Sequence, residues 1–268
     1  MALIGALTKE QVVRLDDQGY LALPEFISPA EVAEIGAIFD HLLASKAGWQ
    51  DGNQFDLAGT DDGGDAKLPQ ILYPSKYAPT LKNHAVVQRA RHIAEAYFGE
   101  PPHADYGEHM IFKPPRDGAV TPWHQDQAYH DPTLDERALN FWIPLDDCDE
   151  QNGCMHYVPG SNRLDVLPHH SIGHDPSVHG LEVDEPEKHA AQSVSCPLSS
   201  GGCIMHLPTT LHYAGPNRSA RQRRAYILIM EVPGTKRSVP VDNYWMREKR
   251  TARMERAEQV SGAEPKPL

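Results

Sequence analysis

Cysteine is scarce in this sequence, and excess positive charge is absent. Four cysteines occur, at 148, 154, 196 and 203, and no two form a CxxC pair. We therefore expect no cysteine-based zinc site, and free thiols favour a cytoplasmic protein. The chain has 25 Lys and Arg residues against 37 Asp and Glu residues, which gives a formal net charge of −12. This balance disfavours a nucleic-acid binder, because such proteins normally present a basic surface.

Long apolar segments are also missing. No run approaches the roughly 20 apolar residues that cross a bilayer, so we expect no membrane partner. The opening stretch "MALIGALTKEQVVRL" lacks a basic segment and a cleavage signal, and we interpret it as the start of a helix. The 268 residues suffice for one large domain with a sizeable core. The sequence does not indicate an oligomeric state.

The first third of the chain is predicted to be mainly helical. Thr8 and Gln11 have capping-box spacing, and "SPAE" from Ser28 to Glu31 begins a second helix. Residues 80–98 favour a third helix that ends at Gly99. Between them, residues 49–79 show no period and many Gly, Asp and Pro residues. We predict a mobile surface loop there, of the kind that often covers a site.

After residue 100 the pattern changes to short apolar or alternating runs separated by turn residues. This pattern predicts an all-β sandwich or barrel, and it lacks the strand–helix alternation of a doubly wound fold. We expect one mainly β domain with a double-stranded β-helix (jelly-roll, cupin-like) core. Residues 1–99 would provide helical support and a lid loop, 100–235 the core, and 236–268 a charged helix and a frayed tail. The His-rich segment 164–195 is interpreted as a solvated insertion.

One short motif suggests a metal site. In "PWHQDQAY", His124 and Asp126 are two residues apart, and on a strand such residues point the same way. Non-haem Fe(II) oxygenases use two histidines and one carboxylate on one face of the metal. His206 and His212 are the candidates for the third ligand. An oxygenase that uses 2-oxoglutarate also needs a cation for the far carboxylate of that molecule, which arginine pairs in bidentate fashion.

Three arginines could supply that cation, namely Arg221, Arg223 and Arg224. Strand alternation predicts that Arg223 and Arg224 face opposite ways. Exposed arginines are more often solvated or ion-paired than used as ligands, so we expect those that do not face the site to lie at the surface.

Four sequence blocks in a fixed order resemble the phytanoyl-CoA dioxygenase family of Fe(II)- and 2-oxoglutarate-dependent oxygenases. They are "FKPP" at 112–115, "TPWHQD" at 121–126, "FWIPLDDCDEQNGCMHYVPGS" at 141–161 and "LHYAGPNRSARQRRA" at 211–225. The resemblance implies that His124, Asp126 and His212 bind iron, and that Arg223, eleven residues after His212, binds 2-oxoglutarate. His206 is then a core or supporting residue.

The resemblance also implies residues around the co-substrate and the substrate. Gln125 and Trp142 match positions that line the co-substrate pocket, and His109, four residues before Lys113, is a further candidate. Tyr129 and Gln127, just beyond the HxD motif, are our candidates for substrate contacts, together with the loop 49–79.

Two departures from the family pattern concern finer contacts. Asn162 stands where many members have histidine, and Ala214 stands where some have serine. Halogenating relatives replace the carboxylate ligand with a small residue, so the presence of Asp126 favours hydroxylation.

The expected reaction consumes Fe(II)-bound 2-oxoglutarate and O₂, hydroxylates an unactivated C–H bond, and releases succinate and CO₂. The acidic balance favours a small metabolite or natural-product intermediate over a polyanion such as coenzyme A. Two alternatives stay open from the residues alone: a non-catalytic metal-binding β-barrel, and a metal-dependent hydrolase or isomerase on a similar barrel.

Overall fold

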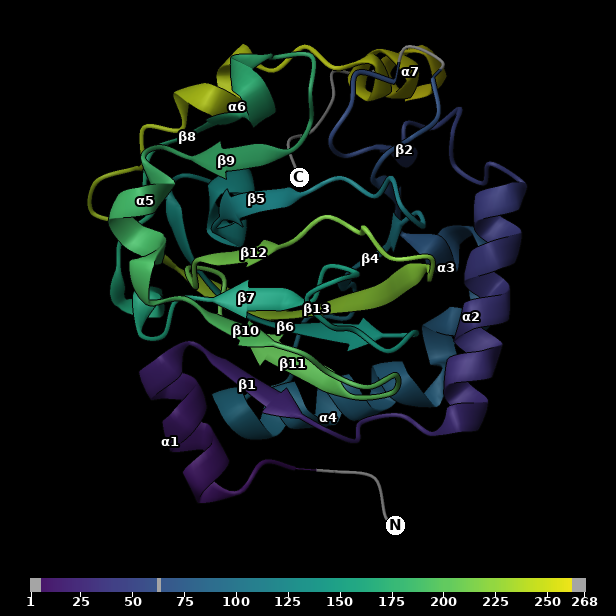
Figure 1. Cartoon of the computed structure of the whole chain (residues 1–268). Coiled ribbons are helices and arrows are strands. Elements are labelled where there is room, and N and C mark those ends of the chain that lie inside the picture. Colours follow the sequence, from purple (N-terminus) through teal and green to yellow (C-terminus); the bar gives the residue numbers. More distant parts are fainter. Residues whose placement is uncertain (1–5, 62–63, 262–268) are drawn as a thin grey trace.

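Two antiparallel sheets form the centre of the computed structural model, which describes residues 6–61 and 64–261 (Figure 1). The major sheet has seven strands in the order β1 (Tyr20–Leu23), β11 (Cys203–His206), β6 (Leu134–Pro144), β13 (Arg223–Lys236), β4 (Gly107–Lys113), β3 (Pro69–Leu72) and β2 (Gln54–Asp56). The minor sheet has four, β10 (Val194–Cys196), β7 (Met155–Tyr157), β12 (His212–Ala214) and β5 (Thr121–His124). A separate hairpin pairs β8 (His169–Ser171) with β9 (Leu181–Val183).

Helices flank this framework. They are α1 (Lys9–Gln18), α2 (Pro29–Ala44), α3 (Pro74–Tyr77), α4 (Ala85–Phe98), α5 (Pro186–His189), α6 (Tyr244–Glu248) and α7 (Ala252–Ser261). Short 3₁₀ turns occupy Pro79–Asn83, Asp126–Tyr129, Ser161–Arg163, Ile172–His174 and Ala190–Gln192. No helix of the described residues is long and apolar enough to cross a membrane. All four cysteines are free thiols.

The predicted helix boundaries are confirmed where they depend on local chemistry. The Thr8 hydroxyl and the Gln11 side chain form a capping box at α1, which ends at Gly19 with a left-handed φ of 80°. Ser28 and Glu31 form a second capping box at α2. Residues 80–98 divide into a 3₁₀ turn and α4, because the His84 side chain caps the backbone at Val86 and starts a new helix.

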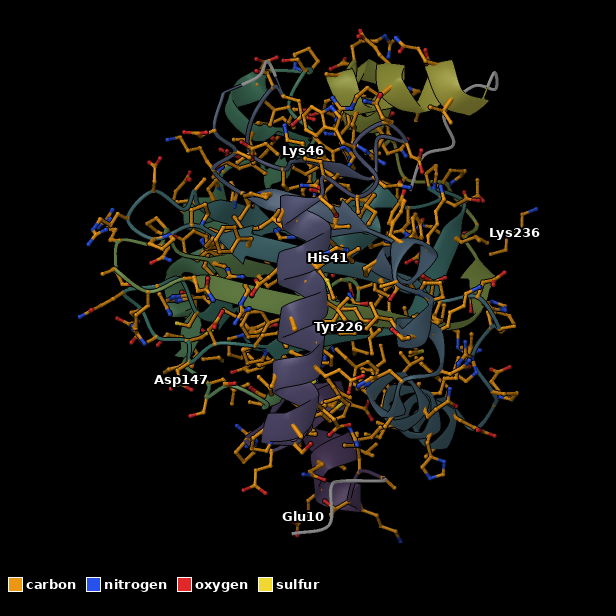
Figure 2. The ribbon with its side chains drawn as sticks, turned by 90° about the vertical axis from the view of Figure 1, so that its right-hand side faces the viewer. Glu10, His41, Lys46, Asp147, Tyr226 and Lys236 are labelled. Carbon is orange, nitrogen blue, oxygen red and sulfur yellow. The ribbon has the colours of Figure 1, made fainter. Side chains whose placement is uncertain are left out.

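The main apolar core lies between the major sheet and the long helices. It includes Phe39 of α2, Ile93 of α4 and Tyr226 of β13, all fully buried. Figure 2 shows α2 crossing in front of the major sheet, with Tyr226 labelled beside it. A second cluster, around Tyr157, Ile204 and Ile227, belongs to the inner faces of the two sheets. One face of the major sheet is therefore covered by helices, and the other face is free to form a site.

The prediction of a loop over residues 49–79 is wrong. This stretch forms β2, β3 and α3 and extends the edge of the major sheet. Its strands are three and four residues long, too short to show alternation in sequence. Asp56, interpreted as a loop residue, is buried, and its carboxylate accepts hydrogen bonds from the backbone N–H groups of Ala58, Lys67 and Leu68. The stretch predicted as a loop thus contributes β2 and β3 to the major sheet.

The prediction of a solvated insertion over residues 164–195 also fails in part. His169 and His179 are buried, and the segment contains the β8–β9 hairpin. The side chain that covers His169 is Trp245 of α6, which is distant in the sequence. The two ring centroids lie 5.5 Å apart, and the Trp245 N–H donates to the carbonyl of Ala128. The predicted charged C-terminal helix is two helices, α6 and α7. The expected frayed tail from residue 262 lies outside the described residues.

Candidate active site

Three predicted ligands converge on the inner side of the minor sheet. His124 ends β5 and lies directly opposite His212, the first residue of β12, with ring centroids 4.1 Å apart. The Asp126 Oδ1 atom lies 3.5 Å from His124 Nε2 and 3.6 Å from His212 Nε2. The three ligand atoms lie within 4.8 Å of one another. Two imidazoles and one carboxylate on one side of a common point fit Fe(II), since this set leaves further positions open.

The convergence has a different local cause from the one predicted. β5 ends at His124, and Asp126 begins the 3₁₀ turn Asp126–Tyr129. The two side chains therefore meet because the chain turns after the strand, and not because they share one strand face.

Backbone carbonyls orient both imidazoles. His124 Nδ1 lies 2.8 Å from the carbonyl of Pro122, and His212 Nδ1 lies 2.9 Å from the carbonyl of Thr210. A carbonyl accepts only, so each Nδ1 carries the proton and each Nε2 lone pair is free. Burial, followed by the nearby charge of His124, holds the pKa of His212 well below its usual range. The His212 ring is thus prepared as a neutral metal ligand, and the His124 ring is oriented in the same way.

Two side chains of the major sheet hold the other oxygen of Asp126. Asn140 Nδ2 donates to Oδ2, and His206 Nε2 lies 3.0 Å from the same atom. The Tyr157 hydroxyl lies 3.1 Å from His206 Nδ1. Burial alone would raise the pKa of Asp126, but the neighbouring His212, His124 and His206 hold it well below its usual range. Oδ2 is therefore engaged by the protein, and Oδ1 faces the two ligand histidines.

A buried arginine lies in the same cavity. Arg223 is 1% exposed, and its guanidinium lies 5.5 Å from the Trp142 ring centroid. Its Nε atom is buried without a hydrogen-bond partner, and no carboxylate of the described chain forms an ion pair with it. Burial lowers its pKa. A buried cation without a counter-ion is unfavourable, so the position fits an anionic ligand.

The neighbouring arginines face elsewhere, as predicted. Arg224 pairs with Asp146 and Asp40 on the helical side of the sheet, and Arg221 pairs with Asp149 at the surface. Strand alternation thus separates Arg223 from Arg224.

The cavity has a volume of about 420 Å³ and lies between the sheets. Arg223 and Trp142 line it together with His124, Asp126 and His212. The predicted residues His109 and Tyr129 line it too. Burial lowers the pKa of His109 to about 4, so its ring is neutral. The Tyr129 hydroxyl accepts from the backbone N–H of Leu181, and its ring packs on His124 with centroids 6.2 Å apart.

Two predicted contact residues do not line the cavity. The Gln125 amide donates to the carbonyls of Asp165 and Thr209 and accepts from the N–H of Leu167. The Gln127 amide is likewise bound to the backbone of Leu134 and Glu136. Because backbone groups occupy these amides, both residues secure loops around the site, and the assignment of contact roles to them is corrected.

Asn162 and Ala214, the two positions that differ from the family pattern, lie around the site, and so does Lys113. Ala214 lines the cavity, and Asn162 donates to the carbonyl of Asp16 on α1. Lys113 is buried beside Arg223 in the register of β4 and β13, and its Nζ atom donates to the carbonyls of Ala119 and Ala214. It does not line the cavity, whereas His109 does.

Sequence reasoning missed several cavity residues. Gln70 and Leu72 come from β3, which was interpreted as loop, and His179 comes from the segment interpreted as solvated. Glu231 lies eight residues after Arg223 on β13, so strand alternation alone predicts that both side chains face the cavity. Asn140 carries no sequence signal, because its role depends on a contact between β6 and Asp126 in the turn after β5.

Known proteins are similar to this chain in structure or in sequence. The solved structure of EvdO2 from Micromonospora carbonacea var. aurantiaca, complexed with 2-oxoglutarate, is 34% identical with a TM-score of 0.76, covering 92% of this chain and 99% of that chain. A probable alpha-ketoglutarate-dependent hypophosphite dioxygenase from Stutzerimonas stutzeri is 29% identical over 80% of this chain and 74% of its own length. A phytanoyl-CoA dioxygenase from Arabidopsis thaliana is 25% identical over 88% of this chain and 93% of its own.

The fold and these relatives define an Fe(II)- and 2-oxoglutarate-dependent dioxygenase, an oxidoreductase whose co-substrates are 2-oxoglutarate and O₂. The family model described as phytanoyl-CoA dioxygenase matches residues 15–225, and the chain belongs to that family. The predicted family and cofactors are thereby confirmed, and the two alternatives without oxygenase activity are not supported.

Proposed function

We propose that this enzyme hydroxylates an unactivated C–H bond of a small metabolite or natural-product intermediate, with His124, Asp126 and His212 as iron ligands and Arg223 as the 2-oxoglutarate anchor. The observation that carries the proposal is the meeting of two buried features in one cavity. One is a His–Asp–His set with ligand atoms within 4.8 Å, and the other is an arginine without a counter-ion. The two facing sheets fit a double-stranded β-helix, and the free thiols fit a cytoplasmic location.

The chain's own residues would divide the work as follows. Fe(II) with 2-oxoglutarate and O₂ supplies the oxidation of the C–H bond, with release of succinate and CO₂. Arg223 binds the distal carboxylate of 2-oxoglutarate through a two-pronged guanidinium contact, and Trp142 covers that guanidinium. His109 and Tyr129 close the walls and keep water out. Asp126 occupies the position that halogenating relatives leave empty, which supports hydroxylation.

The direct test is succinate formation from 2-oxoglutarate with Fe(II) and ascorbate across a panel of small metabolites. We expect turnover above the substrate-free rate for at least one compound and no turnover with His212→Ala. Arg221→Ala serves as the matched control for Arg223→Ala, because Arg221 is a surface arginine paired with Asp149. If both arginine variants bind 2-oxoglutarate like the wild type, the proposed anchor is wrong.

A further inference from the structure

The cavity is electrically asymmetric along one strand. On β13, Arg223, Ile227 and Glu231 lie on the same face and all line the cavity. At about 3.3 Å per residue, Arg223 and Glu231 are separated by about 26 Å along the strand. Arg223 is the only lysine or arginine among the lining residues that the structure describes. The described lining of the end away from Arg223 therefore offers no lysine or arginine to a phosphate or a carboxylate, and its histidine, His130, is paired with Glu136.

Glu231 lies in a cluster of two carboxylates and one histidine, so its negative charge is compensated only in part. His130 Nδ1 pairs with Glu136 at 2.6 Å, and the ligand atoms of His130, Glu136 and Glu231 lie within 4.8 Å of one another. One imidazolium can neutralise only one of the two carboxylates. No ion pair of the described chain involves the Glu231 carboxylate. Burial and then the charge of Glu136 raise its pKa, and the nearby His130 and His103 oppose this rise without cancelling it. A cation from outside would remove this repulsion.

Two further residues line the cavity. Asp105 is exposed at the cavity wall, two residues after His103, whose backbone N–H donates to the carbonyl of Glu231, and Tyr73 is 42% exposed. The Tyr73 hydroxyl lies within electrostatic range of Glu231: burial raises its pKa, Arg253 opposes this, and Glu231 adds to it. Carboxylates beside an aromatic face are the groups that bind an ammonium, through charge and through the ring quadrupole.

An independent observation indicates a polar ligand in this cavity. His179 is 5% exposed and lines the cavity, and its Nδ1 atom has no hydrogen-bond partner. Its ring stacks on Tyr129 with centroids 5.9 Å apart, and Tyr129 in turn contacts His124. Burial, together with Arg253 and Lys249, holds the pKa of His179 well below its usual range, so the ring is neutral. A buried polar group without a partner is costly unless a ligand satisfies it.

We propose that the substrate carries a protonated amino group, which Glu231 and Asp105 bind beside the ring of Tyr73, while a carbon of the same molecule lies before the metal ligands. The inference rests on the proposed function for the identity of that metal site, but the amine subsite is made of other residues. It disfavours substrates whose binding requires a lysine or arginine at this end, such as coenzyme A thioesters. A neutral, hydroxyl-rich molecule is the competing occupant of this subsite, and the test below distinguishes it from an amine.

The test compares three six-carbon probes that differ only in the head group, hexylamine, hexan-1-ol and hexanoate, and it adds glucose as a neutral hydroxyl-rich probe. Binding is measured by calorimetry on the enzyme with Fe(II) and 2-oxoglutarate in the absence of oxygen, so that no turnover interferes. We expect hexylamine to bind roughly tenfold more tightly than hexanol, as one charge-assisted contact provides, and hexanoate to bind worst. Glu231→Gln should remove the preference for the amine. Glu34→Gln, a carboxylate of α2 with a side chain 58% exposed, is the control and should keep it.

The outcomes separate this inference from the proposed function. Equal binding of hexylamine and hexanol, tighter binding of hexanoate, or tighter binding of glucose than of the amine would overturn the amine subsite even if 2-oxoglutarate binds normally. Failure of 2-oxoglutarate to bind would overturn the proposed function instead. In that case the binding of hexylamine and hexanol is compared on the metal-free wild type and the metal-free Glu231→Gln variant. A preference for the amine that the variant loses supports the subsite, and equal binding in the wild type overturns it.

Discussion

Replacing His206 by leucine tests whether this residue supports the iron site without being a ligand. In the structure its Nε2 atom lies 3.0 Å from Asp126 Oδ2, and the Tyr157 hydroxyl lies 3.1 Å from its Nδ1. Because Asp126 accepts only, Nε2 must donate, and Nδ1 of a neutral ring then accepts from Tyr157. His206 thus fixes the carboxylate so that Oδ1 faces the two ligand histidines.

The expected magnitude follows from the hydrogen bonds at Oδ2. A hydrogen bond to a charged group contributes roughly 1.5–3 kcal/mol, and loss of a residue that orients a ligand weakens metal binding roughly 10- to 100-fold. Asn140 still donates to Oδ2 in the variant, so we expect the lower end, about tenfold. His206→Gln retains an N–H donor and should recover part of the affinity.

Calorimetric titration of the metal-free protein with Mn(II) measures this effect. His156→Leu is the matched control, because His156 is a half-buried histidine of β7 whose ring contacts Tyr213 instead of Asp126. Thermal unfolding of each metal-free variant reports any general loss of stability. Unchanged Mn(II) affinity in His206→Leu would refute the supporting role. A loss of Mn(II) binding as complete as that expected for His212→Ala would also refute the supporting role, because His206 would then be a ligand.

Three further outcomes are expected. Arg223→Ala should weaken 2-oxoglutarate binding roughly 10- to 100-fold in a fluorescence titration, with Arg221→Ala unchanged. Gln125→Leu should lower the free energy of unfolding by about 1–3 kcal/mol in urea while leaving 2-oxoglutarate affinity intact, since its amide binds only backbone groups. Burial lowers the pKa of Lys249 to about 7, so above pH 7 the folded state binds fewer protons than the unfolded state. The contribution of this group to the free energy of unfolding should therefore rise between pH 7 and 8.5. The Lys249→Met variant should show a flatter rise in the same urea titrations.

Local chemistry explains why some features could be predicted from the sequence. The caps at Thr8 and Ser28 depend on side chains three residues apart, and those contacts form in any chain with that spacing. The opposite directions of Arg223 and Arg224 follow from the two-residue period of a strand. Features that depend on distant contacts were predicted badly. The buried Asp56 of β2 and the buried His169 under Trp245 are polar residues whose partners lie elsewhere in the chain.

By itself, the sequence determined the family, the cofactors and the candidate ligands, because four motif blocks stand in a fixed order and an HxD motif is followed by a histidine and an arginine at set intervals. Only the tertiary structure decided which polar residues face the cavity. Gln125 and Glu231 show why: the backbone carbonyls that occupy Gln125 and the carboxylate that repels Glu231 come from segments about 40 to 100 residues away. A side chain's partner across a sheet is set by packing, which no local spacing records.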